Sequence, residues 1–240
     1  MGNDRWRRRR GQHPGETSSS RTPSTIDRSF ELDEIDEQIA RLFDLVTQGL
    51  AAATAAFLTA DVAAARRVVS ADLVIDELHR GTEALVQRQL LSATDGIEAD
   101  GLARLVLALR IMPELERSGD LVEHIAARAS TVLLTQLSDR ARSIIRQMGE
   151  VAGELWRRTA DSFTGGDSPT IAELRFIDDR LDDLHVQLGV ELAEAQLSVA
   201  AAIEMGLVGR FFERLGDHAV NVARRVDTEV QNPFALASPA

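Results

Sequence analysis

The segment DLVIDELH at residues 72–79 recurs 106 residues later as DDRLDDLH at residues 178–185, with Asp, Asp, Leu and His in the same places. The same offset places Phe57 on Phe163 and Asp61 on Asp167 without a gap. A second motif, ERSGD at 116–120, returns as ERLGD at 213–217 with an offset of 97. Self-similarity at a fixed spacing indicates tandem duplication, and the shorter connection in the second copy is a change that loops tolerate.

Apolar residues in each copy recur at steps of three and four, the period of an amphipathic helix. We predict helices from Leu32 to about 58, from the N-cap Asp61 to about 91, and from about 98 to about 134. Pro113 is expected to kink or split the third helix. Three further helices are predicted from Ser138 to about 230. The first and third helices are predicted from the periodic apolar residues Leu32, Ile35, Ile39, Leu42, Val46, Leu50, Leu102, Leu105, Leu109 and Met112.

The sequence therefore predicts an all-α fold of two tandem three-helix bundles related by internal duplication, with six helices in all. A length of 240 residues allows two such units, each large enough to bury a core. We place a disordered Arg-rich arm at residues 1–29, the first bundle at 30–135, the second at 136–230 and a frayed tail at 231–240.

Composition restricts the chemistry. The chain has no Cys, so any metal must use oxygen or nitrogen ligands. The net charge is −11, and because residues 1–29 carry seven Arg against three acids, the rest of the chain carries −15. An acidic body repels nucleic acid and attracts cations and basic protein surfaces. No secretory signal is seen and no window approaches the ~20 apolar residues of a membrane span, so we expect a cytoplasmic protein that does not insert into the membrane.

Carboxylates in the two motifs are paired at a spacing of four, which puts both members on one face of a helix. Like charges at this spacing repel, so their recurrence indicates a cation that offsets the repulsion. Oxygen-rich clusters suit Mg²⁺, Mn²⁺, Ca²⁺ or iron, and His79 and His185 on the same faces favour transition metals. The alternative is a solvated acidic face without metal. The candidate ligands are Asp72, Asp76, Glu116 and Asp120 in the first copy and Asp178, Asp182, Glu213 and Asp217 in the second.

Gly119 and Gly216 lie inside the acidic motifs, in helix interiors where Gly costs about 1 kcal/mol relative to Ala. Such residues mark close backbone approach, whether or not a site is present. His124 and His218, which follow the motifs, are expected to be surface or capping residues. The sequence contains no nucleophile–base pair, phosphate-binding glycine loop or dinucleotide fingerprint, so we expect no enzymatic activity.

The segments 115–120 (LERSGD) and 212–223 (FERLGDHAVNVA) resemble the duplicated LERIGDHAxNIA signature of the PhoU family, the phosphate-transport accessory proteins. Residues 72–78 (DLVIDEL) are similar to that family's D-x-x-I-D-x-L run, and the resemblance extends from about residue 28 to about 230. One departure is Pro113, which stands just before the first acidic motif.

This resemblance implies two three-helix bundles with metal ions held by the eight acids named above. It also implies a negative regulator of phosphate uptake and phosphate-starvation signalling that acts between a phosphate ABC transporter and a sensor histidine kinase, and that forms homodimers. The rival from another class is a carboxylate-bridged di-iron oxidoreductase of the ferritin-like kind, because Asp76-x-x-His79 and Asp182-x-x-His185 imitate its ligand pairs. A metal-free helical scaffold is the third hypothesis.

Overall fold

A computed structural model describes residues 23–91, 98–129, 131–166 and 169–231 of the chain. These residues form seven helices and no strand. The helices are α2 (Pro23–Thr59), α3 (Val62–Leu91), α4 (Ala99–Ala127), α5 (Thr131–Gln136), α6 (Asp139–Thr164), α7 (Ile171–Glu194) and α8 (Val199–Gln231). The predicted all-α fold is confirmed.

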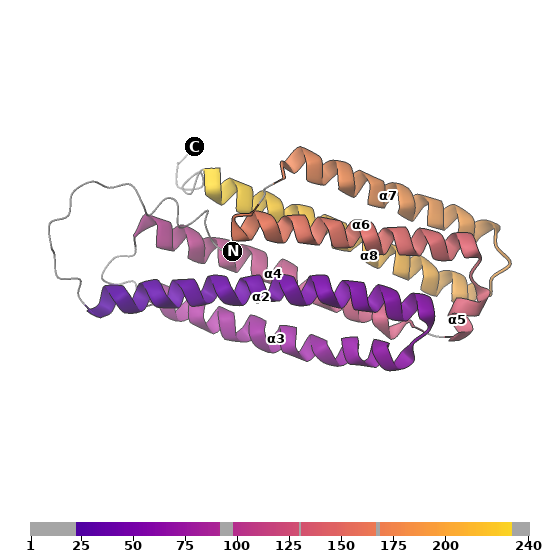
Figure 1. Ribbon diagram of the computed structural model, residues 1–240, viewed down its shortest axis with the longest axis horizontal. Helices are drawn as coiled ribbons and strands as arrows, with labels where there is room; N and C mark the ends of the chain where they lie inside the picture. Colours follow the sequence, from indigo (N-terminus) through magenta and orange to yellow (C-terminus); the bar gives the residue numbers. More distant parts are fainter. Residues whose placement is uncertain (1–22, 92–97, 130, 167–168, 232–240) are drawn as a thin grey trace.

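The six long helices run lengthwise through an elongated bundle (Figure 1). Helices α2, α3 and α4 pack on one another, as do α6, α7 and α8, so each copy of the repeat is a three-helix bundle. The two bundles meet where α2 packs on α6 and α4 packs on α8. Each of these helices packs on the equivalent helix of the other copy. The two copies are therefore related by a pseudo-two-fold axis, as subunits are in an isologous dimer interface.

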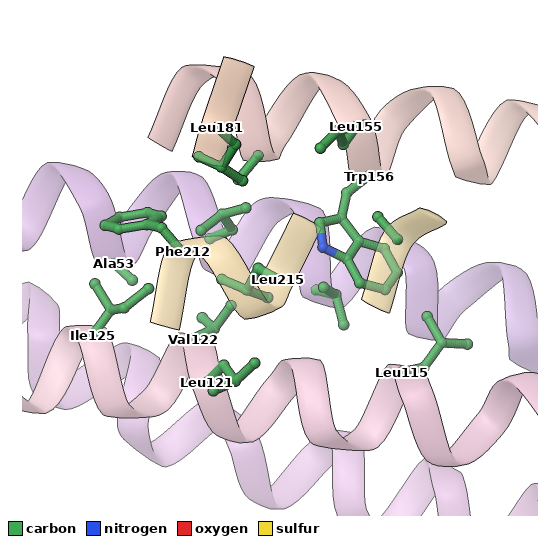
Figure 2. Close-up of a cluster of buried hydrophobic side chains, with 14 of the residues drawn as sticks. Ala53, Leu115, Leu121, Val122, Ile125, Leu155, Trp156, Leu181, Phe212 and Leu215 are labelled. Atoms are coloured by element: carbon green, nitrogen blue, oxygen red, sulfur yellow. The ribbon is translucent and has the colours of Figure 1, made fainter. Parts of the chain in front are cut away.

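One hydrophobic core runs through both bundles. Figure 2 shows Leu115 and Val122 of α4 in the same cluster as Trp156 of α6 and Phe212 of α8. Phe43 of α2 crosses the seam between the bundles, with its ring 6.1 Å from Trp156 and 5.4 Å from Phe163. The packing of α2 and α6 is close enough that a Cβ on Gly149 would lie 2.5 Å from Cγ2 of Thr54. The duplicated halves therefore form a single folding unit.

Polar side chains begin the helices where the sequence predicts. Asp61 Oδ1 accepts a hydrogen bond from the Ala64 N–H at 2.8 Å, and Ser138 Oγ accepts one from the Ala141 N–H at 3.0 Å. Thr170 and Glu173 form a reciprocal capping box at the start of α7. Each cap satisfies a backbone donor that the first helical turn leaves without a partner.

Several predicted boundaries need correction. Seven helices replace six in the described residues, because the third predicted helix ends at Ala127 and a short α5 follows it. The end coincides with Arg128, whose side chain leaves α4 to pair with Glu204 of α8 at 2.8 Å. Pro113 does not split α4, since the fully buried Met112 and Leu115 on either side hold the helix in the core.

The ends of the chain also differ from the prediction. Helix α2 begins at Pro23, so residues 23–29 are helical and do not belong to a disordered arm. Proline suits the first position of a helix because it needs no N–H partner there. Residues 1–22, the predicted break at 92–96 and the tail at 232–240 lie outside the described residues. The boundary predicted between 135 and 136 falls within α5.

The buried stripe of α4 is displaced from the predicted one. Leu105 and Met112 are buried, but Leu102 and Leu109 are 39% and 40% exposed. Because α4 packs against α2, α3 and α8 together, its buried surface is broad and includes Leu107, Ala108 and Ile111.

One helix meets the length and composition of a membrane span, contrary to the sequence prediction. This is the Glu31–Thr59 part of α2. Its apolar side chains, among them Ile39, Phe43 and Leu50, are buried in the core against other helices. The central helix of a water-soluble bundle passes the same test, so the finding is weak evidence for a membrane.

Candidate functional site

The structure brings the predicted acids of the first repeat together in the groove between α3 and α4. Asp72 and Asp76 come from α3, whereas Glu116 and Asp120 come from α4. Burial raises the pKa of Asp72 to about 6, assisted by the charges of Asp76 and Asp120 and, more weakly, of Glu123 and Glu116. Burial and the charge of Asp120 also raise the pKa of Glu116. The four carboxylates therefore share one electrostatic environment.

The second repeat reproduces this cluster between α7 and α8. Burial, together with the charges of Asp182, Asp217, Asp179 and Glu213, raises the pKa of Asp178 to about 6. Burial likewise raises the pKa of Asp182, with Asp217 as the next contributor. The two clusters are separate, because α3 and α7 lie on the outside of their bundles and do not pack on each other.

The two predicted glycines allow these helices to approach. A Cβ on Gly119 would lie 3.1 Å from Asp72 Oδ1, and a Cβ on Gly216 would collide with Asp178 Oδ1. The same Cβ on Gly216 would lie 2.8 Å from Leu181 Cδ2. The prediction of close backbone approach is confirmed: the first aspartate of each cluster lies beside its glycine, accompanied in the first repeat by Ile75, whose Cδ1 would lie 3.0 Å from a Cβ on Gly119.

The histidines add a nitrogen donor to each groove. His79 lies near enough to Glu116 for its charge to lower the pKa of that carboxyl. His185 acts in the same way on Asp182 and Glu213, and its ring lies over Gly209, with Cδ2 3.2 Å from the position of a Cβ there. Each groove therefore combines four carboxylates with one imidazole, a donor set that suits Mn²⁺, Fe or Zn²⁺ as well as the harder cations.

The second cluster differs from the first in one respect. Arg210 forms an ion pair with Glu213 at 2.5 Å, and its charge opposes the increase in the pKa of Glu213 that burial causes. The other oxygen, Glu213 Oε2, is buried and has no hydrogen-bond partner within the described part of the chain. A buried carboxylate oxygen without a partner carries a cost that a bound cation would remove.

The acidic side chains of the two clusters are not arranged as a coordination sphere. Among the described residues no three acids or histidines converge closely enough to hold a metal. Mutual repulsion separates carboxylates, so ligation would require rotamer changes of the partly exposed side chains, such as Asp76 and Glu116. The donor types fit a cation, and the geometry shown is that of neighbouring acids rather than a formed coordination sphere.

A second polar constellation, which the sequence did not predict, lies between α4 and α8. Glu114 is buried and pairs with His218 through Oε2 and with Arg225 Nη2 through Oε1 at 2.8 Å. Arg225 Nη1 also donates to the Arg110 carbonyl, and Arg110 pairs with Glu229 at 3.0 Å. His218 is thus a buried interface residue, which corrects the expectation of a surface or capping role.

The pseudo-two-fold relation is visible in these contacts. At the offset of 97, Glu114 corresponds to Phe211 and Arg225 to Arg128, and Arg128 lies over the Phe211 ring at 4.8 Å. The ring of His124 stacks on the same Phe211 at 5.3 Å. At this position the two copies differ, with an acid in the first and an aromatic residue in the second.

Comparison with known proteins gives a consistent family. The PhoU domain model matches residues 39–129 and 145–226, one match in each repeat. The "Phosphate-specific transport system accessory protein PhoU homolog 2" of Mycobacterium tuberculosis is 31% identical over 207 residues, 85% of this chain and 96% of that protein.

Two solved structures are similar in fold. The PhoU structure from Pseudomonas aeruginosa has a TM-score of 0.76 at 23% identity and covers 85% of this chain and 98% of its own. The phosphate transport system regulatory protein PhoU from Streptococcus pneumoniae has a TM-score of 0.70 at 20% identity, covering 85% and 97%. The helical fold, the doubled domain match and the similarity over 85% of the chain together establish that the chain belongs to the PhoU family.

Proposed function

We propose that the chain is a cytoplasmic accessory protein of a phosphate transport system, which represses phosphate uptake and phosphate-starvation signalling. Its partners in this role are a phosphate ABC transporter and a sensor histidine kinase, and it acts as a homodimer without catalysing a reaction. The observation that carries the regulatory role is the match to a phosphate-transport accessory protein over 96% of that relative's length.

We further propose that each acidic cluster holds metal, either a divalent cation or iron. The ligands are Asp72, Asp76, Glu116 and Asp120 in the first repeat and Asp178, Asp182, Glu213 and Asp217 in the second. What supports this is the raised pKa of the first aspartate in both repeats, because a groove that makes carboxylates costly to ionise gains most from a cation.

The arrangement favours a regulator over a di-iron oxidase. A ferritin-like oxidase collects its carboxylates and histidines inside one four-helix bundle. Here the acids form two clusters in separate grooves, and Asp182 and Asp217 of the second cluster are exposed. Metal at such positions is accessible to a partner's side chains, which suits an adaptor and does not suit the sequestration of an oxidising intermediate.

Charge complementarity supports protein partners. The chain beyond residue 29 carries −15, so its surface favours association with basic protein surfaces and disfavours contact with nucleic acid or anionic lipid. Metal bound by the acidic clusters would reduce the negative charge there and could present open coordination positions to a docking protein.

The experiment is a deletion of the gene followed by measurement of a phosphate-starvation reporter at high phosphate. We expect the reporter to become active in the deletion strain and to be silenced again by the intact gene. If the reporter stays silent after deletion in a strain without a second copy, the regulatory proposal is wrong.

The contribution of the acids is tested in the same strain with Glu213→Gln plus Asp217→Asn. This variant should restore repression less well than the intact protein at equal abundance. The matched control is Glu77→Gln plus Glu150→Gln, which removes the same charge from two exposed positions that contribute to neither cluster. If both variants repress the reporter equally well, metal binding by the second cluster is not required for the regulatory role.

A further inference from the structure

Pro113 leaves a hollow on the surface where α4 passes α8. The positions 109, 113 and 117 follow one stripe of α4, and the short proline ring in the middle cannot fill the space between its neighbours. The result is a hollow of about 390 Å³, lined by Leu109, Arg110, Pro113, Glu114, Arg117 and Arg225.

Three arginines border this hollow, and their donors are only partly used. Arg110 pairs with Glu229 through Nη1, and Arg225 uses Nη1 and Nη2 for the Arg110 carbonyl and Glu114. Each guanidinium has five N–H donors, so both retain unused ones, and each side chain is 35% exposed. Arg117 is exposed and forms no hydrogen bond or ion pair with any residue that the structure describes.

The acid in the lining is already compensated. Both oxygens of Glu114 are engaged, one by Arg225 and the other by His218. Glu229 pairs with Arg110, and Glu116 lies beside Arg117 without forming an ion pair with it. Arg117 therefore supplies a guanidinium without an ion-pair partner next to two that retain donors, on a protein whose net charge is −11.

The second repeat provides an internal comparison. At the offset of 97 the position of Pro113 is Arg210, whose long side chain pairs with Glu213. Arg110 corresponds to Leu207, whereas Arg117 and Arg225 correspond to the exposed Arg214 and to Arg128, which pairs with Glu204. The combination of Pro113 with Arg110 therefore has no equivalent in the second repeat.

We infer that the Pro113 hollow binds a tetrahedral oxyanion of the phosphate class, with Arg117 as its main donor and Arg110 and Arg225 beside it. Guanidinium groups match such oxygens in pairs, and a concave site that holds several of them excludes part of the competing water. The inference does not rest on the proposed regulatory function, because it uses neither the acidic clusters nor the partners.

The test is titration of the full chain with inorganic phosphate by ³¹P NMR at low ionic strength, after divalent metals have been dialysed away. We expect saturable binding with a Kd of roughly 1 mM or lower, the weak end of specific affinity. Arg117→Ala should weaken binding about tenfold, because one charge-assisted contact is lost. Arg214→Ala, the equivalent exposed arginine of the second repeat, should leave the Kd unchanged.

A further variant distinguishes phosphate binding in the hollow from non-specific electrostatic attraction. Pro113→Arg copies the second repeat and adds a positive charge, which would strengthen non-specific attraction to phosphate but should weaken binding here because the side chain fills the space. A second titration with O-phosphoserine distinguishes the source of the ligand. Tighter phosphate binding indicates the free ion, and tighter O-phosphoserine binding indicates a phosphorylated side chain; in both cases Arg117→Ala must reduce the affinity.

The inference is overturned if phosphate shows no saturable binding, if Arg117→Ala and Arg214→Ala have equal effects, or if Pro113→Arg binds phosphate more tightly. Circular dichroism of each variant verifies that the helices are intact. Since Arg117, Arg214 and Pro113 are not fully buried, we expect all three variants to fold.

Discussion

Substitution of Gly149 tests the packing between the two bundles, at the contact of α6 with α2. A Cβ at this position would lie 2.5 Å from Thr54 Cγ2, 2.8 Å from Oγ1 and 3.1 Å from Cβ. Thr54 is buried and its hydroxyl donates to the Leu50 carbonyl at 2.8 Å, and because Cβ itself is close, rotation of the side chain cannot relieve the contact. Gly149→Ala must therefore move the helices apart.

The size of the stability loss is estimated by comparing Gly149→Ala with a matched substitution, Gly153→Ala. Gly153 is in the same helix, and a Cβ there would meet nothing within 4 Å. Both substitutions gain the same helix propensity, about 1 kcal/mol, so the difference between them is the steric cost alone, about 1–3 kcal/mol. For a chain of this size, about 2 kcal/mol corresponds to a separation of about 4–8 °C in Tm.

The assay is thermal and urea unfolding of the two variants beside the parent protein. We expect Gly153→Ala to be more stable than the parent and Gly149→Ala to be less stable. Adding Thr54→Ala to Gly149→Ala should recover part of the loss, which a double-mutant cycle measures. Equal stability of the two single variants would refute the close α2–α6 packing.

Three further predictions concern the clusters and the core. Burial raises the pKa of Asp178 to about 6, so its ionised form destabilises the metal-free protein above that pH, and this penalty is lost as the pH falls through 6 and the folded state takes up a proton. Asp178→Asn should therefore stabilise metal-free protein at pH 7.5, by on the order of 1 kcal/mol after allowance for partial exposure, and by less at pH 5; an equal gain at both pH values in urea unfolding would contradict this. Gly216→Ala should turn the Asp178 carboxylate aside and weaken Mn²⁺ binding in a calorimetric titration, whereas Gly206→Ala, with open space around it, should not. Arg104→Met should cost about 3 kcal/mol in urea unfolding because it removes the guanidinium whose Nη2 lies 2.5 Å from the buried Asp36 carboxylate; a loss below about 1 kcal/mol would argue against that pair.

Local features of the fold were predictable because they follow from short-range physics. The cap at Asp61 was visible as a polar residue before an apolar period, and Ser138, where a helix was predicted to begin, also caps its helix. The interior glycines Gly119 and Gly216 predicted close helix approach, because nothing else compensates their cost in a helix. The duplication then placed the aspartates in equivalent grooves.

Features that depend on how the two bundles dock were not predictable from one sequence. The periodicity of α4 was correct, but which stripe is buried depends on three neighbouring helices, so Leu102 and Leu109 were assigned to the wrong side. The pairing of Glu114 with His218 and Arg225 joins residues more than 100 positions apart, across an interface that no spacing rule describes. Arg128, directly after the end of α4, pairs with Glu204 of α8, another contact between residues far apart in the sequence.

Metal stoichiometry tests the central claim, which is that each repeat holds cations on its own acidic cluster. The measurement is calorimetric titration of metal-free protein with Mn²⁺, for the parent and for Asp178→Asn plus Asp217→Asn. The account predicts that the variant loses the sites of the second repeat and binds half as many ions, with unchanged affinity for those that remain. The same stoichiometry and affinity in both proteins would contradict it.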